Sequence, residues 1–318
     1  MKFLVVGAGA VGGVAGARLA RGGHDITLVA RGAHLDAIRT RGLTVHAPTG
    51  TEVVRLGAVE RPVVAAETIV LLAVKTHDVA DALRSLALVA PATTPIVCMT
   101  NGIEAERLAL RWFDRIYAMC VYTPSTFLEP GVVEAWGTPV AGQYDVGRYP
   151  DGSDETCAAI AAAFESARMS SRVVIDIMRW KRGKLLFNLS NALDALCGPS
   201  ARTHPIVDEL RAEAERCYAS AQLTSTPPEE AAARRGDFQA GRIAGRTRSG
   251  GSTWQSLSRG ASIVECEYLN GEIALLGRMH GVPTPLNDAL VREVTRAAAA
   301  GTRPGSMSID ELAARLTA

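Results

Sequence analysis

Apolar and polar positions in the first half of the chain follow a pattern that predicts strands separated by helices. The apolar runs expected to form strands lie at 2–6, 26–29, 68–74 and 95–99. Helix-type spacing of apolar residues covers 10–21, 33–40 and 79–89. The run at 68–74 is apolar after its first residue, as expected for a strand buried on both faces of a parallel sheet. This alternation predicts a doubly wound parallel sheet.

The pattern changes in the second half. Short β-like runs over 116–143, separated by Pro-Gly and Gly signals, predict a mixed or antiparallel extension, and a helix over 153–168 and a last strand over 172–175 follow. Beyond residue 175, Ala, Leu, Glu and Arg dominate and predict helices. We therefore expect an α/β protein with an N-terminal Rossmann-type domain over 1–175 and a C-terminal all-α domain over 176–318.

Composition fits a soluble globular protein and excludes several classes. The 318 residues are 47% apolar and 21% charged, with a formal net charge of +1, so neither nucleic acid nor an anionic membrane is an expected partner. No apolar stretch reaches the ~20 residues of a membrane helix. Glycines interrupt the apolar run after Lys2 too early for a signal peptide. We expect a cytoplasmic protein.

The six cysteines and six histidines are dispersed, with no CxxC pair and no cluster at metal-ligand spacing. An even number of cysteines is compatible with disulfides, but a large chain without secretory features favours reduced thiols. No metal site is expected.

The first predicted turn carries the pattern GxGxxG. Gly7, Gly9 and Gly12 follow a strand directly, and Ala10 and Val11 open the predicted helix. In this context the glycines permit a tight turn, close approach of a pyrophosphate and close helix–strand packing, while the helix N-terminus offers free N–H groups. A purely structural glycine turn is the alternative. We expect dinucleotide binding.

The end of the second predicted strand decides the cofactor. Enzymes that use NAD place an acidic residue there against the ribose 2′-hydroxyl, but here Arg31 follows the strand, and the acidic Asp25 precedes it. A guanidinium suits a 2′-phosphate, so NADPH/NADP⁺ is the expected cofactor, with a solvated surface arginine as the alternative.

Two further residues follow predicted strands. Lys75 and Asn101 come at or just after the ends of the third and fourth strands, where open α/β sheets bind ligands. Lys75 is equally compatible with a surface position or with contact to cofactor phosphate or ribose. Asn101-Gly102 is a common turn dipeptide, but we favour an asparagine that binds nicotinamide or substrate.

Several of these motifs, in this order, resemble the ketopantoate reductase (2-dehydropantoate 2-reductase) family over nearly the whole chain. The motifs are GAGAVGG at 7–13, Arg31, AVKT at 73–76, Asn101-Gly102, Pro130-Gly131, WKRGKLLFN at 180–188 and VECEYLNGE at 264–272. The resemblance implies hydride transfer from NADPH to the carbonyl carbon of a 2-oxo acid, which gives a 2-hydroxy acid. Ketopantoate is the best single candidate substrate.

The resemblance also assigns roles in the second domain. It implies that Lys184 is the general acid and binds substrate with Asn188, four residues later on the same helical face. Lys181 is a rival, and both lysines are compatible with ordinary surface positions. Glu265 corresponds to the family glutamate that supports substrate binding and the position of the lysine.

The family's substrate-binding hydroxyl corresponds to Ser252 or Thr253, of which the spacing to Glu265 favours Thr253. This chain departs from the family pattern nearby. The second asparagine falls at Asn191, one residue early, and Thr253-Trp254 replaces the usual Ser-Met.

These departures leave the reductase interpretation intact but put ketopantoate itself in doubt. Two alternatives therefore stay open. One is a reductase of another 2-oxo acid or related carbonyl compound, and the other is a non-catalytic NADP(H)-binding sensor. The sequence does not decide the assembly, for which a homodimer is one option.

Overall fold

Six parallel strands and one antiparallel edge strand form the large sheet. They are β1 (Lys2–Val6), β2 (Asp25–Val29), β5 (Gly57–Val59), β6 (Thr68–Leu72), β7 (Ile96–Cys98), β8 (Ile116–Tyr122) and β12 (Gln143–Arg148). Their order is β12-β8-β7-β6-β1-β2-β5, with β12 antiparallel to β8. The chain winds outward from β1 through β2 to β5, and then from β6 to β8 on the other side. This is the Rossmann arrangement, in which ligands bind at the carboxyl ends of the strands where the winding reverses.

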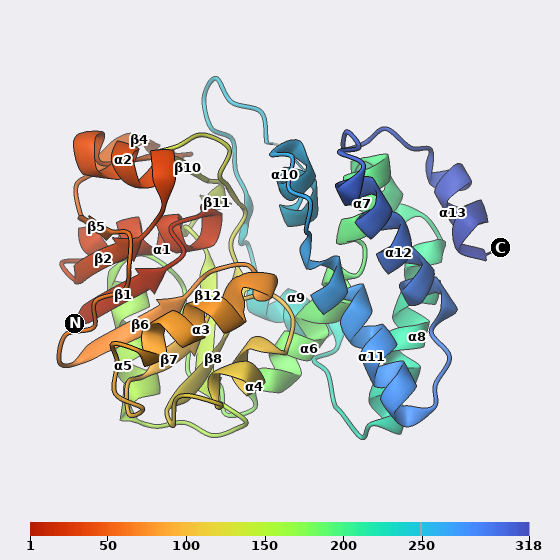
Figure 1. The fold of residues 1–318 in the computed structure, drawn as a ribbon, viewed down its shortest axis with the longest axis horizontal. Helices are drawn as coiled ribbons and strands as arrows, with labels where there is room; N and C mark the ends of the chain where they lie inside the picture. The colour runs from red at the N-terminus through yellow and green to blue at the C-terminus, as the bar shows by residue number, and fades with distance from the viewer. Residues whose placement is uncertain (249, 318) are drawn as a thin grey trace. The chain divides into compact units, whose positions relative to one another are not determined.

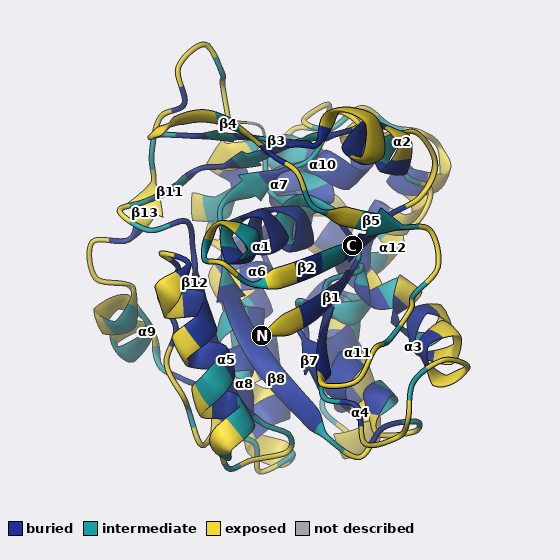
Figure 2. Ribbon diagram, turned by 90° about the vertical axis from the view of Figure 1, so that its left-hand side faces the viewer, coloured by how far each residue is buried: buried dark blue, intermediate teal, exposed yellow. Residues whose placement is uncertain are grey.

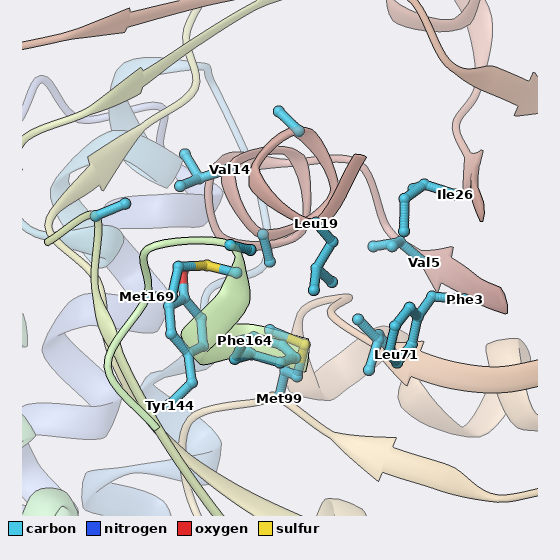
Figure 3. Packing of buried hydrophobic residues seen from close by; sticks show 14 of the residues in the cluster. Phe3, Val5, Val14, Leu19, Ile26, Leu71, Met99, Tyr144, Phe164 and Met169 are labelled. Carbon is cyan, nitrogen blue, oxygen red and sulfur yellow. The ribbon is translucent and has the colours of Figure 1, made fainter. Parts of the chain in front are cut away.

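Helices cover both faces of this sheet. Helices α1 (Ala10–Arg21) and α5 (Glu155–Ser166) pack on one face, and α3 (Val79–Ala87) and α4 (Ala105–Ala109) pack on the other. Figure 3 shows Leu19 of α1 and Phe164 of α5 in the same cluster as strand residues such as Phe3. Strand β8 is buried over almost its whole length (Figure 2). Burial on both faces explains why these strands read as continuous apolar runs.

A smaller sheet packs on α1. Its strands are β3 (Leu43–Ala47), β4 (Gly50–Val54), β9 (Ser125–Thr126) and β10 (Val132–Ala135), in the order β4-β3-β10-β9. A Cβ at Gly13 of α1 would lie 2.9 Å from Val133 of β10, so the second glycine of the GG pair lets this sheet approach the helix. The apolar pattern predicts no element over 43–59, where apolar runs are short and mixed with Thr, Glu and Arg.

One predicted strand is wrong. Residues 172–175 form no strand, and Val173 makes only an isolated bridge to Val146. The segment follows β12 closely enough for backbone hydrogen bonds, such as Val174 N–H to the Val146 carbonyl at 2.8 Å. The pairing stops there, because the chain turns at 175–176 and begins α6 (Ile177–Asn188).

The structure, a computed structural model, describes residues 1–248 and 250–317, which divide into two compact units. The first is Met1–Trp180 with Glu229–Arg248, and the second is Lys181–Pro228 with 250–317. These ranges differ from the expected ones. The division falls inside α6, five residues after the expected boundary at 175, and a late segment belongs to the first unit.

Polar contacts explain why this late segment, Glu229–Arg248, belongs to the first unit. Arg234, in α9 (Pro228–Arg235), donates to both carboxylate oxygens of Asp145 at 2.8 and 2.6 Å. Strand β13 (Gln239–Ala240) pairs with β11 (Gly137–Thr138), and Arg246 pairs with Glu134 at 2.6 Å. Long-range side-chain pairs of this kind have no signature in a local apolar pattern.

The second unit is helical, as predicted (green to blue in Figure 1). Besides the end of α6, it contains α7 (Asn191–Cys197), α8 (Ile206–Ser220), α10 (Ser252–Ser258), α11 (Asn270–His280), α12 (Pro285–Ala299), α13 (Ile309–Thr317) and the 3₁₀ turns Pro199–Thr203 and Glu265–Tyr268. Helices α7, α8, α12 and α13 share one apolar cluster. Within the described ranges, no helix has both the length and the hydropathy needed to cross a membrane.

A buried polar network connects the helices of this unit. The Glu213 carboxylate accepts the backbone N–H groups of Leu286 and Asn287, at 2.9 and 3.0 Å, and so caps the start of α12. Asn287 also donates to Glu213 at 2.7 Å, and Asn270 donates to Asn287 and to the Leu189 carbonyl. The network therefore connects α8, α11 and α12 to the chain directly after α6.

Candidate functional site

The glycine turn has the geometry that the sequence predicts. Gly7 has φ +101°, and a Cβ there would lie 2.9 Å from the backbone of Ala73. A Cβ at Gly12 would lie 2.0 Å from the Gly7 carbonyl oxygen. These two glycines are thus required by the fold itself, Gly7 also by its positive φ.

Gly9 differs from the other two glycines. Its φ of −72° is accessible to any residue, and a Cβ there would have no atom within 4 Å. Gly9 is the N-cap residue of α1, and Ala10 and Val11 form the first turn. The first amides of a helix have no partner within it and carry the positive end of the helix dipole. The open space at Gly9 therefore lies beside an anion-binding helix end, which fits a pyrophosphate.

Arg31 lies at the same edge of the sheet. It follows Ala30 at the carboxyl end of β2, is exposed, and is the N-cap residue of α2 (Gly32–Arg41). The Gly7 N–H donates to the carbonyl of Val29, the last residue of β2, at 3.3 Å. The end of β2 and the glycine turn are therefore direct neighbours, and the Arg31 guanidinium is available to an anion beside the turn.

Lys75 and Asn101 follow the next two strands. Strand β6 pairs with β1, and β7 pairs with β6, all in parallel. Lys75 is half-buried and precedes the short 3₁₀ turn Thr76–Asp78. Thr76 donates to the Asn101 carbonyl at 3.3 Å, which joins the loops after β6 and β7.

The four predicted groups thus share one edge of the sheet, at the ends of four adjacent strands in the order β2, β1, β6, β7. They are Arg31, the glycine turn, Lys75 and Asn101. The edge offers the first amides of α1, the Arg31 guanidinium and the Lys75 ammonium. This set of groups fits a phosphorylated dinucleotide.

In the second unit, Lys184 and Asn188 lie one turn apart near the end of α6. Lys184 is half-buried and Asn188 is 6% exposed. Gly183 precedes Lys184, and a Cβ there would lie 2.6 Å from the Thr226 carbonyl oxygen. Arg182 donates to the Thr224 carbonyl. The loop after α8 therefore packs closely against this turn of α6, which explains the glycine of WKRGK.

The rival lysine and the glutamate are both buried. Lys181 is 3% exposed, so it is not the ordinary surface lysine that its position in the sequence allowed. Glu265 begins the 3₁₀ turn Glu265–Tyr268 and is 4% exposed. Charged side chains are costly to bury unless they are paired, so neither residue is an ordinary solvated surface charge.

The predicted hydroxyl segment begins α10. Ser252 is half-buried and Thr253 is 2% exposed, and Gly251 is the N-cap residue. The Gly251 N–H donates to the Asp194 carboxylate of α7 at 2.9 Å. Asp194 therefore fixes the start of α10.

Asp194 belongs to a polar cluster that was not predicted from the sequence. Arg202 donates to Asp194 at 2.9 Å and to the Asn191 side-chain oxygen at 3.0 Å. Its other terminal nitrogen lies 3.3 Å from the Ser190 hydroxyl. The oxygen of Asn191, a predicted substrate ligand, is thus engaged by Arg202. One signal was present, because Asp194 is the single charged residue of the apolar stretch NALDALC.

The cysteines are buried or half-buried and form no disulfide. Burial raises the pKa of Cys266 to about 12 and those of Cys157 and Cys197 to about 11, so these thiols stay protonated near neutral pH. Among the described residues, no three His, Cys, Asp or Glu side chains are grouped as they would be to hold a metal.

Two family models match most of the chain. The model described as "Ketopantoate reductase PanE/ApbA" matches residues 3–151, and its C-terminal counterpart matches 176–298. A 2-dehydropantoate 2-reductase of Pyrococcus horikoshii is 30% identical over 59% of this chain and 61% of its own length. One of Halobacterium salinarum is 29% identical over 90% of this chain and 95% of its own.

Solved structures agree with this assignment. A PanE/ApbA family ketopantoate reductase from Ralstonia eutropha is 27% identical, with a TM-score of 0.77 over 95% of this chain and 100% of that one. D-mandelate dehydrogenase, solved with NADH and anilino(oxo)acetate, shares the fold at 20% identity and a TM-score of 0.77, over 98% and 100% of the two chains. The chain belongs to the ketopantoate reductase family of NADP-dependent oxidoreductases.

Proposed function

We propose that this protein reduces a 2-oxo acid to the 2-hydroxy acid with NADPH, and that ketopantoate is the first substrate to test. The observation that carries the proposal is the common edge of β2, β1, β6 and β7, to which Arg31, the glycine turn, Lys75 and Asn101 all belong. The family membership supports the reaction class.

The first unit binds the cofactor in this proposal. NADPH, when bound, supplies the hydride that reduces the substrate carbonyl carbon. The first amides of α1 bind the pyrophosphate beside Gly9, and the Arg31 guanidinium binds the 2′-phosphate in a charge-assisted hydrogen bond. Lys75 and Asn101 contact the ribose, phosphate or nicotinamide part.

The second unit supplies the proton. As the carbonyl carbon accepts hydride, its oxygen gains negative charge, and the Lys184 ammonium stabilises this charge and donates a proton to it. Asn188, on the same face of α6, holds the substrate by hydrogen bonds, as do Asn191 and the hydroxyl of Ser252 or Thr253. Glu265 acts through Lys184 by holding its ammonium in position.

A different 2-oxo acid is the second candidate, and the Asp194–Arg202 cluster favours it. Arg202 uses the side-chain oxygen of Asn191, which leaves that residue's amide N–H groups for a substrate. Leu257 is 6% exposed and belongs, with Trp254 packed against it, to the apolar cluster of the helical unit, so this part of α10 presents no carboxylate to a substrate. A 2-oxo acid that makes fewer polar contacts than ketopantoate fits this arrangement.

The test is the rate of NADPH oxidation with ketopantoate and with a panel of 2-oxo acids of increasing side-chain size. The proposal requires turnover with at least one of them, and the ranking of kcat/KM identifies the substrate class. Tight NADPH binding without turnover of any compound would instead identify a sensor. Absence of NADPH binding would refute the proposal as a whole.

A further inference from the structure

A histidine of the first unit connects the glycine turn to a distant loop of the same unit. The Nε2 atom of His34, in the first turn of α2, lies 2.7 Å from the Ala8 carbonyl oxygen. Its Nδ1 atom lies 2.8 Å from the backbone nitrogen of Gly131. The two partners are 26 and 97 residues away along the chain, so the ring makes tertiary contacts rather than a local turn.

These partners determine the protonation of the ring. A backbone N–H only donates, and a carbonyl oxygen only accepts. Nδ1 of His34 must therefore be unprotonated and Nε2 must carry the hydrogen, which makes the ring neutral. Burial lowers the pKa of His34 by more than the hydrogen bond to the Ala8 carbonyl raises it, and so favours the neutral form.

The loop partner is itself firmly placed. Gly131 has φ +81°, and a Cβ there would lie 2.7 Å from the Cβ of Ala37 in α2. Its carbonyl accepts the Thr44 N–H of β3 at 2.9 Å. The His34 ring also packs on Phe127, with ring centroids 4.4 Å apart. Gly131 and Phe127 therefore fix the His34 ring, while its Nε2 atom contacts the glycine turn.

The hydrogen bond to Ala8 orients the next amide of the turn. The Ala8 carbonyl and the Gly9 N–H belong to one peptide group, which is trans, since the cis bonds of the described chain are Thr138–Pro139 and Tyr149–Pro150. In a trans peptide the C=O and N–H point in opposite directions. Because the Ala8 carbonyl points to His34, the Gly9 N–H points away from that ring, at the start of α1.

We infer that His34 is a positioning residue of the dinucleotide site, which holds the Ala8–Gly9 peptide so that its N–H is presented to the cofactor pyrophosphate. The inference rests on the proposed function, since it requires NADPH at the glycine turn. His34 acts through the turn, so its loss affects cofactor affinity and leaves the chemistry and the binding of the 2-oxo acid unchanged.

The experiment compares His34→Phe and His34→Gln with the wild type. Phe keeps an aromatic ring against Phe127 but makes neither hydrogen bond, whereas the Gln amide can donate to Ala8 and accept from Gly131. We expect His34→Phe to raise the NADPH Kd and KM about five- to tenfold, with kcat at saturating NADPH and the KM of the 2-oxo acid unchanged. His34→Gln should recover most of the affinity. His24→Phe is the matched control, since His24 precedes β2 at the other end of the sheet.

The outcomes separate the two proposals. A wild type that does not bind NADPH refutes the proposed function and this inference together. Normal NADPH affinity in folded His34→Phe, or equal losses in the Phe and Gln variants, refutes the inference alone. Nitrogen-15 NMR of the imidazole gives a check that needs no cofactor, because the inference requires the Nε2–H tautomer and an Nδ1–H tautomer contradicts it. If His34→Phe fails to fold, the NADPH Kd of His34→Ala takes its place in the comparison with His34→Gln, and equal losses in the two variants refute the inference.

Discussion

At the residue scale, the proposed reaction depends on single side chains that supply a proton or a positive charge. Lys184 is the strongest case in the second unit, because the proposed reaction needs a proton donor at the carbonyl oxygen. We expect Lys184→Ala to lower kcat by about 10²-fold or more. Steady-state rates with saturating NADPH and the best 2-oxo acid measure this.

Lys181→Ala is the control variant for this prediction. Lys181→Ala should keep most of the kcat of any enzyme that folds, since Lys181 is assigned no part in the chemistry. A near-normal rate in Lys184→Ala together with a collapse in Lys181→Ala would transfer the role of general acid to Lys181.

Arg31 gives a prediction about cofactor choice. Arg31→Ala removes a charge-assisted hydrogen bond that only NADPH can form, so the NADPH Kd should rise about 10- to 100-fold while the NADH Kd changes little. Isothermal titration with both cofactors measures this. Arg41→Ala, at the other end of α2, is the control and should change neither value. Equal losses for both cofactors in Arg31→Ala would show that Arg31 does not bind the 2′-phosphate.

At this scale the sequence predicts the position of residues that directly follow a strand, while their roles in binding stay predictions. Arg31, Lys75 and Asn101 were proposed because each follows an apolar run, and the topology brings them to one edge. His34 and Asp194 were missed. Their partners, Ala8, Gly131 and Gly251, are defined only by tertiary structure.

At the element scale, apolar periodicity predicted the strands that are buried on both faces and the helices α1, α2 and α3, but not the short helix α4. It failed for β3 and β4 of the small sheet, over 43–54, and wrongly made 172–175 a strand. The conformation of both segments depends on tertiary contacts. The small sheet depends on close approach to Gly13 of α1, and residues after 170 follow β12 through a few backbone hydrogen bonds. Neither contact can be predicted from the residues of the segment itself.

The buried carboxylate of Glu213 gives a prediction for the helical unit. Glu213→Ala would leave the Leu286 and Asn287 N–H groups and the Asn287 amide without their acceptor, at a cost of about 3 kcal/mol or more in the free energy of unfolding. Chemical denaturation measures this, with the exposed Glu229→Ala as control. A change below about 1 kcal/mol would show that the network is not important for stability.

At the scale of the whole molecule, stability should depend on pH through three histidines. Burial is the largest cause that lowers the pKa values of His24, His34 and His46, and the N-terminal amine and Arg246 add to this for His24 and His46 respectively. The unfolded chain therefore binds more protons than the folded one below the ordinary histidine pKa of 6.5. Their contribution is present above this value and is lost as the pH falls through the lowered pKa values.

Thermal unfolding between pH 7.5 and pH 5.5 tests this dependence. The melting temperature should fall as the pH is lowered, and a variant with His24, His34 and His46 replaced by Gln should show a smaller fall. A melting temperature that rises towards pH 5.5 would contradict the assignment of these histidines as neutral in the folded protein.

The sequence predicts the fold class of the two units but not which unit contains the late segment Glu229–Arg248. The fold class follows from the change in composition near residue 175. The return of Glu229–Arg248 to the first unit depends on the pairs Arg234–Asp145 and Arg246–Glu134, which join residues 89 and 112 positions apart. Charged residues at such separations have many alternative partners, so the sequence alone does not select these.

The measurement that tests the central claim most directly is the NADPH Kd of Gly9→Ala together with its melting temperature. The φ of Gly9 is −72° and the space at its Cβ position is open, so the substitution should cost about 1 kcal/mol of stability or less. If a pyrophosphate binds in that space, the added methyl group should weaken NADPH at least about tenfold. A folded Gly9→Ala protein that binds NADPH as tightly as the wild type would contradict the account.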